Sequence, residues 1–172
     1  MCASSPGCTT TASTTRSPVA ASRRPGSRRP ASPESPAPPQ ARLARVARRV
    51  LVWERAAGAR VEVTLLDGAA MRRLNRRATG RRGLTDVLAF ALPQPDGTLL
   101  GDVYICPAAA HGWVSGRGRG KGEGVEAELV RLAVHGTLHV LGYDHPDGVG
   151  RMRSAMWRRQ ERYVRRLLNG TS

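Results

Sequence analysis

Three of the four histidines in this 172-residue sequence lie within residues 135–145, which read HGTLHVLGYDH. His135 and His139 are four residues apart, so on a helix both imidazoles project from the same face. Gly142 favours the end of that helix, and the turn after it lets His145 approach from outside the helix axis. Three imidazoles in this arrangement are typical of a zinc site, where Zn–N distances are about 2.0–2.1 Å. We therefore predict that His135, His139 and His145 bind one zinc ion per chain.

The chemistry expected of this site follows from its donor set. Three neutral nitrogens without a thiolate leave the ion with an open position and most of its positive charge, whereas structural zinc sites are usually closed by four protein ligands. Such an ion can lower the pKa of water to about 7 or bind a phosphate oxygen. The pattern therefore predicts hydrolytic chemistry. His111 stands alone in another segment and is interpreted as structural.

The same spacing, H-x-x-x-H-x-x-G-x-x-H, is the metal frame of the metzincin peptidases. In this sequence Gly136 stands where those enzymes carry the glutamate that serves as general base. Because a peptidase of this type needs that proton acceptor, we expect no peptide substrate. A phosphodiester needs it less, since metal and arginine charge can stabilise the transition state.

The charge of the chain favours a polyanionic partner. Lys and Arg number 28 against 13 Asp and Glu, which gives a formal net charge of +15 and a sequence pI of about 11.6. Such an excess attracts nucleic acid without specifying a sequence, although high-GC coding also enriches arginine. The three cysteines are widely spaced and no run of 18 apolar residues exists, so we expect a cytoplasmic protein with no membrane partner.

The elements that must position the histidines belong to one expected domain, residues 41–169. Residues 1–40 hold eight of the twelve prolines and are expected to be a disordered, arginine-rich extension. Beyond them, residues 116–124 are glycine-rich and should form a mobile loop. The patterns predict a domain of helices packed on a small sheet, of the α+β or α/β layer class. The expected strands are 60–66, 86–92 and 99–106, and the expected helices are 41–57, 69–77, 107–114, 125–141 and 148–168.

Several further motifs resemble those of the YbeY family of bacterial metal-dependent endoribonucleases. Besides the histidine segment, the matching motifs are Leu74-Asn75, Thr85-Asp86-Val87-Leu88-Ala89-Phe90, Leu100-Gly101-Asp102-Val103, and Met156 followed by Gln160-Glu161. The resemblance implies a small mixed four-stranded sheet packed with five or six helices, with the zinc site at the end of a central helix. It also implies a single-strand-specific endoribonuclease that acts in small-subunit ribosomal RNA maturation and ribosome quality control, and that associates with the small ribosomal subunit.

One motif departs from the family pattern. Family members carry Tyr-Arg-Gly ahead of the Thr-Asp motif, whereas this chain has Thr79 at the arginine position. We take Arg81 as the candidate catalytic residue, with Arg82 as the alternative, because a guanidinium on a long side chain can bind phosphate from several backbone positions.

Metal-bound imidazoles are usually oriented by a second hydrogen-bonding group. Asp144 is the candidate for this role, with Asp86 and Asp102 as alternatives; all three could instead have structural roles.

Two broader questions about the function stay open at this point. The nucleophile could be water or the ribose 2′-hydroxyl, and the chain could instead be a non-catalytic, zinc-stabilised ribosome assembly factor that contacts phosphates.

Overall fold

The computed structural model describes residues 39–115 and 124–170. The expected extension therefore lies outside the described residues except for residues 39 and 40, and so does the expected loop at 116–124 except for Gly124. The first helix, α1, spans Pro39–Trp53 and starts two residues earlier than expected. Proline is favoured at the first position of a helix, because its missing N–H would have no partner there.

Three strands form the sheet of the described residues: β1 (Ala59–Leu65), β2 (Val87–Pro93) and β3 (Leu99–Ile105). Their order is β1-β3-β2; β2 and β3 form the expected antiparallel hairpin, while β1 is parallel to β3. The sheet is therefore mixed, as expected. Four strands were expected, and the described residues contain three. Each of the three segments with a strand pattern forms one of them.

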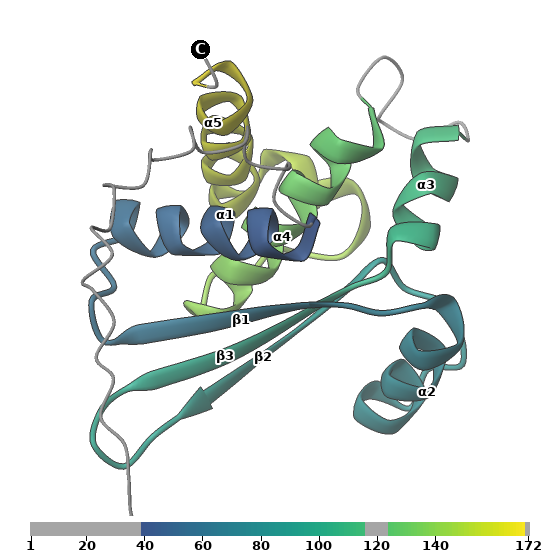
Figure 1. The fold of residues 1–172 in the computed structure, drawn as a ribbon, viewed down its shortest axis with the longest axis horizontal. Coiled ribbons are helices and arrows are strands. Elements are labelled where there is room, and N and C mark those ends of the chain that lie inside the picture. Colours follow the sequence, from purple (N-terminus) through teal and green to yellow (C-terminus); the bar gives the residue numbers. More distant parts are fainter. Residues whose placement is uncertain (1–38, 116–123, 171–172) are drawn as a thin grey trace, which may run out of the picture. The chain divides into compact units, whose positions relative to one another are not determined.

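Within the described ranges, five α-helices accompany the sheet, which confirms the α+β class: α1, α2 (Gly68–Thr79), α3 (Pro107–Ser115), α4 (Val125–Val140) and α5 (Ala155–Asn169). Helices α1 and α4 lie on the same side of the sheet, and α5 packs against α4 (Figure 1). Their shared core is mostly aliphatic, and its fully buried members include Val50, Val63, Val103, Ile105, Val134, Leu138 and Met156. Among the described residues, no helix is both long and apolar enough to cross a membrane.

Helix α4 approaches β3 closely at two glycines. A Cβ atom at Gly101 on β3 would lie 2.3 Å from Val140 Cγ1, and one at Gly136 on α4 would lie 2.5 Å from Val103 Cγ1. Real Cβ atoms essentially never approach other atoms so closely. The two glycines therefore let the histidine-bearing helix sit directly on the sheet, one from each side of the interface.

The single helix expected at 148–168 is wrong at its start. The structure has a 3-10 helix, η1, at Gly148–Arg153, and α5 begins only after Ser154. The Ser154 side chain accepts a hydrogen bond from the Trp157 N–H at 3.1 Å and so caps α5. Serine is favoured at the N-cap, where its side chain replaces a backbone hydrogen bond of the helix. Ser154 therefore starts a new helix, and α5 is separate from the turn that follows His145.

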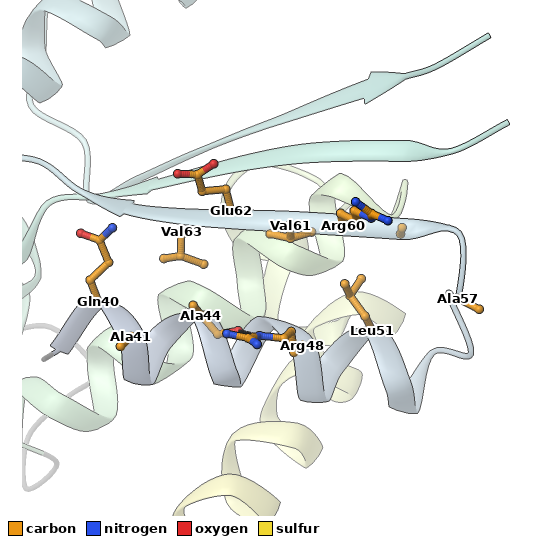
Figure 2. A pocket seen from close by; sticks show the side chains of 11 residues that line it. Gln40, Ala41, Ala44, Arg48, Leu51, Ala57, Arg60, Val61, Glu62 and Val63 are labelled. Atoms are coloured by element: carbon orange, nitrogen blue, oxygen red, sulfur yellow. Dashed lines mark hydrogen bonds between the residues drawn. The ribbon is translucent and has the colours of Figure 1, made fainter. Parts of the chain in front are cut away.

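A cavity of about 780 Å³ lies between α1 and β1 (Figure 2). Leu51 and Val63 are among its apolar lining residues, and its charged lining residues are Arg48, Arg60 and Glu62. It contains no histidine or cysteine. This cavity therefore does not offer the donor set of a catalytic metal site.

Candidate metal centre

The three histidines of residues 135–145 come together at the C-terminal end of α4. His135 and His139 lie one turn apart on the helix, and His145 lies in the loop that follows. The Nε2 atom of His135 is 3.1 Å from that of His139 and 3.5 Å from that of His145. One ring nitrogen from each residue lies within 4.8 Å of the other two, so the group could hold a metal ion.

Two of the three nitrogen–nitrogen distances match those between ligands of a zinc ion, and all three nitrogens lie within 4.8 Å of one another. Two ligands at about 2.05 Å from a tetrahedral ion are separated by about 3.3 Å, and the observed 3.1 and 3.5 Å bracket that separation. Within the part of the chain that the structure describes, the group has three members and no fourth side-chain ligand. The donor set is thus three imidazoles, which suits an ion that keeps a position for a ligand from outside the chain.

The loop that carries His145 is fixed by backbone hydrogen bonds at the end of α4. Gly142 adopts a φ of 85° and donates its N–H to the His139 carbonyl at 2.9 Å, while the Tyr143 N–H donates to the Leu138 carbonyl at 3.0 Å. The left-handed conformation suits glycine. Asp144 Oδ1 then accepts the His145 N–H at 2.8 Å. Gly142 therefore ends the helix as expected and turns the chain back toward His135.

Two of the histidines have a defined tautomer. The Nδ1 atom of His135 is 2.8 Å from Gln160 Oε1, and the Gln160 amide nitrogen donates to Glu161 Oε1 at 3.0 Å. Since the amide oxygen can only accept, His135 donates from Nδ1 and keeps the lone pair on Nε2. The Nδ1 atom of His145 is 3.2 Å from the Pro146 carbonyl oxygen, so the same reasoning applies there. Both Nε2 lone pairs are therefore available to an ion.

Burial keeps the pair on the helix neutral. It lowers the pKa of His135 from 6.5 to about 3, although the hydrogen bond to Gln160 acts in the opposite direction. The positive charge of Arg151 lowers this pKa further. Burial also lowers the pKa of His139. A neutral imidazole need not lose a proton before it binds a metal ion. His135 and His139 are thus in the protonation state that metal binding requires.

A cleft of about 390 Å³ lies beside the three histidines. The candidate Arg81 lines it from the loop after α2, whereas the alternative, Arg82, is not among its lining residues. The Arg81 N–H binds Thr79 Oγ1 at 3.2 Å. Thr79 in turn donates to Asn75 Oδ1 at 2.8 Å. Thr79 therefore shapes the loop that leads Arg81 to the cleft.

The three aspartates are placed differently from one another. Asp144 and Asp86 line the cleft, but Asp102 does not. Asp144 binds the backbone of His145, and its charge acts on His139 against the lowering of that residue's pKa by burial. The hydrogen bond to a histidine ring that was expected of Asp144 is made to His135 by Gln160 instead.

Two residues at the site, Gln160 and Arg151, were not predicted from the sequence to lie there. Gln160 is 1% exposed and lies on the buried side of α5 with Met156 and Val164. A glutamine within an apolar helical stripe is a signal that could have identified it. Arg151 lines the cleft, and its Nη2 lies 3.4 Å from His135 Nε2. Nothing in the local sequence distinguishes it from the other arginines nearby.

The structure also explains Gly136. Its α-carbon faces Val103 of the sheet, and a Cβ atom there would overlap that side chain. A glutamate at this position would therefore disrupt the helix–sheet contact, which is a steric reason for the glycine. His111 lies on α3 and does not line the cleft.

Comparison with known proteins gives concordant matches. A family model described as Endoribonuclease YbeY matches residues 36–168. A relative of that name from Mycobacterium ulcerans is 37% identical over 101 residues, which cover 52% of this chain and 54% of the relative. Another of that name, from Desulfitobacterium hafniense, is 41% identical over 116 residues, which cover 62% and 69%. The chain thus spans about half the length of the mycobacterial relative.

One solved structure supports the fold. The solution structure of TM1509 from Thermotoga maritima superposes with a TM-score of 0.52 at 26% sequence identity. The match covers 80% of this chain and 87% of the other. The arrangement of helices on the small mixed sheet is therefore shared over most of both chains.

Proposed function

This chain belongs to the endoribonuclease YbeY family, and from that premise we propose that it is a zinc-dependent endoribonuclease that cleaves single-stranded ribosomal RNA. The proposed role is maturation of small-subunit ribosomal RNA and ribosome quality control in the cytoplasm, with the small ribosomal subunit as partner. The net charge of +15 supports a phosphate-rich substrate.

The observation that carries this proposal is the cluster of His135, His139 and His145 in the wall of a cleft. These three residues would hold the ion through their Nε2 atoms. A zinc ion held in this way would supply Lewis-acid stabilisation of charge that develops on a phosphate.

The side chains around the cluster would support this reaction in distinct ways. Gln160 fixes the ring of His135 through its Nδ1 hydrogen bond. Asp144 would support His145 through the backbone hydrogen bond, which fixes the loop rather than the ring. Arg81, which lines the cleft, would contribute positive charge toward RNA phosphates. The steric role of Gly136 supports the view that a peptide is not the substrate, because the general base of a metzincin cannot be placed there.

The proposal is tested by metal analysis and RNA cleavage on the same preparations. The wild-type protein should carry one zinc ion and cleave single-stranded RNA. The His139→Ala variant should lose both properties, because it removes one of the three ligands. The His111→Ala variant, altered outside the cleft, serves as the control and should retain both. Cleavage that persists in folded protein after complete metal removal would show that the proposed mechanism is wrong.

Two further readouts refine the result. A 2′,3′-cyclic phosphate among the products would identify the ribose 2′-hydroxyl as the nucleophile, whereas its absence would identify water. Binding of the His139→Ala variant to small ribosomal subunits is measured beside its RNA cleavage. A variant that still binds subunits but no longer cleaves RNA would show that the two properties are separate. An assembly factor without catalytic activity predicts that the wild-type protein binds subunits and cleaves no RNA.

A further inference from the structure

Arg151 approaches the histidine cluster from a different element than Arg81 does. It lies in η1, after His145, and lines the same cleft. Its Nη2 atom is 3.4 Å from His135 Nε2, the nitrogen whose lone pair faces the other two histidines. A guanidinium group therefore lies directly beside one of the three nitrogens that would hold an ion.

The backbone around Arg151 holds it in this position. Its carbonyl oxygen accepts hydrogen bonds from the Ser154 side chain at 2.7 Å and from the Ser154 N–H at 3.2 Å. Gly148 has a φ of 80°, and a Cβ atom at Gly150 would lie 2.9 Å from Pro146 Cγ. Two glycines thus allow the tight turn that brings η1 back over the cleft.

The charge of Arg151 lacks a carboxylate partner within the described residues. Its Nε atom is buried and no described group accepts a hydrogen bond from it. The ion pairs found in the described part of the chain involve other arginines. A buried donor without an acceptor costs about 1–3 kcal/mol. Such a donor beside a cleft is expected to meet its acceptor in a bound ligand.

The chemistry of that ligand follows from the two positive groups. When a metal ion occupies the cluster, the His135 Nε2 lone pair is used and can no longer accept from Arg151. The guanidinium would then face a cation across a short distance, which is unfavourable unless an anion lies between them. A phosphate offers one oxygen to each side, and a guanidinium can bind its oxygens through two N–H groups.

We propose that Arg151 is a catalytic residue of this chain, which binds a non-bridging oxygen of the scissile phosphate beside the three histidines. This inference rests on the proposed function. It assigns to Arg151 the direct contact with the phosphate. Arg81, which is exposed and lines the same cleft, would add positive charge toward the RNA.

The test compares Arg151→Gln with Arg153→Gln in the full-length chain. Both changes remove one positive charge from η1, but Arg153 is exposed and does not line the cleft. Zinc affinity is measured by chelator competition, phosphate affinity by calorimetric titration of the zinc-loaded chain with inorganic phosphate, and RNA cleavage by kcat and KM. Arg151→Lys, which keeps the charge and loses the fork of donors, is the second variant.

Arg151→Gln should weaken phosphate binding by about tenfold or more, since charged hydrogen bonds are lost, and lower kcat by about 10²–10³-fold. Its zinc affinity should be unchanged or tighter, because a positive charge beside the ion is removed. Arg151→Lys should bind phosphate with intermediate affinity, and Arg153→Gln should match the wild type in all three measurements.

Three outcomes would overturn the inference. Equal phosphate affinity in Arg151→Gln and Arg153→Gln would show that Arg151 does not bind phosphate. Weaker zinc binding in Arg151→Gln and Arg151→Lys would show that the residue only supports the metal site. Wild-type kcat in Arg151→Gln would exclude a catalytic role. If the wild type fails to cleave RNA but phosphate binding still depends on Arg151, the proposed function fails while the phosphate site stands.

Discussion

At the scale of single residues, the candidate site depends on a buried histidine that stays neutral. His135 is 6% exposed and its pKa is lowered to about 3, mainly by burial. Gln160 accepts a hydrogen bond from Nδ1 of His135. The lone pair of His135 therefore stays on Nε2, which faces His139 and His145. A buried imidazole without an ion still has its hydrogen bond to Gln160. The fold therefore accommodates the neutral His135 ring, whereas protonation of this ring is unfavourable.

This protonation makes the stability of the metal-free protein dependent on pH. In the unfolded chain His135 titrates near its ordinary pKa of 6.5, whereas in the folded chain it titrates at about 3. Below about pH 6.5 the unfolded state binds the additional proton, so the free energy of unfolding falls as the pH falls toward about 3. The slope from this residue reaches at most about 1.4 kcal/mol per pH unit. His139, with its lowered pKa, acts in the same direction.

The measurement is urea unfolding of chelator-treated protein between about pH 7 and about pH 5, above the range in which carboxylates titrate. The His135→Gln variant, which removes the titrating group, should show a smaller slope over this interval. A slope equal to that of the wild type would contradict the assignment.

At the scale of elements, the helix that carries two of the histidines is positioned by its close contact with β3. Gly101 of the strand receives Val140 of the helix, and Gly136 of the helix receives Val103 of the strand. Val140 directly follows His139, so the depth at which α4 sits on the sheet also sets the position of that imidazole. The glycine in the H-G-T-L-H segment is thus explained by packing and not by chemistry.

The Gly101→Ala substitution should reduce the free energy of unfolding by about 1–3 kcal/mol, the usual cost of overpacking a core. The added methyl group would overlap Val140, and this outweighs the small gain from replacing glycine in a strand. Chemical denaturation measures the change. Gly58→Ala is the matched control, because nothing lies within 4 Å of its Cβ position. Equal stability of the two variants would mean that α4 moves away without cost.

At the scale of the whole described domain, one buried carboxylate joins three distant parts of the chain. Glu54, just after α1, accepts hydrogen bonds from Tyr143 at 2.8 Å, Arg159 at 2.7 Å and Tyr163 at 2.6 Å. Burial would raise the pKa of Glu54, but these hydrogen bonds hold it below its ordinary value. Tyr143 lies two residues before His145. The cluster therefore ties the histidine-bearing loop to α1 and α5.

Replacing Glu54 by Gln should lower the free energy of unfolding by about 2–4 kcal/mol, because the change removes a charge partner from Arg159 and weakens several charged hydrogen bonds at once. Thermal or urea unfolding tests this. Glu62→Gln, an exposed carboxylate on β1, is the control and should change stability by less than about 0.5 kcal/mol. A Glu54 variant as stable as this control would show that the hydrogen bonds of Glu54 do not hold the loop that carries His145.

Much of the local structure was predictable from the chain alone. The spacing of His135 and His139, the helix end at Gly142 and the hairpin between residues 93 and 97 are short-range patterns, and the structure contains each of these elements. Such features depend on interactions between neighbours in sequence, which propensity and periodicity describe well. The sequence did not predict the break at Ser154, because the apolar spacing continues across it. The break depends on the capping hydrogen bond from the Trp157 N–H to the Ser154 side chain.

The hydrogen-bond partner of His135 and the arginine beside it could not be predicted in the same way. Gln160 is 25 residues from His135, and Arg151 is 16 residues away. Their contacts depend on how α5 packs on α4 and on the turn at Gly148, since a side chain's partner across a fold is set by packing rather than by sequence spacing. The three candidate ligands thus lie within eleven consecutive residues of the sequence. The groups that contact them come from distant segments, and only the tertiary structure brings these segments together.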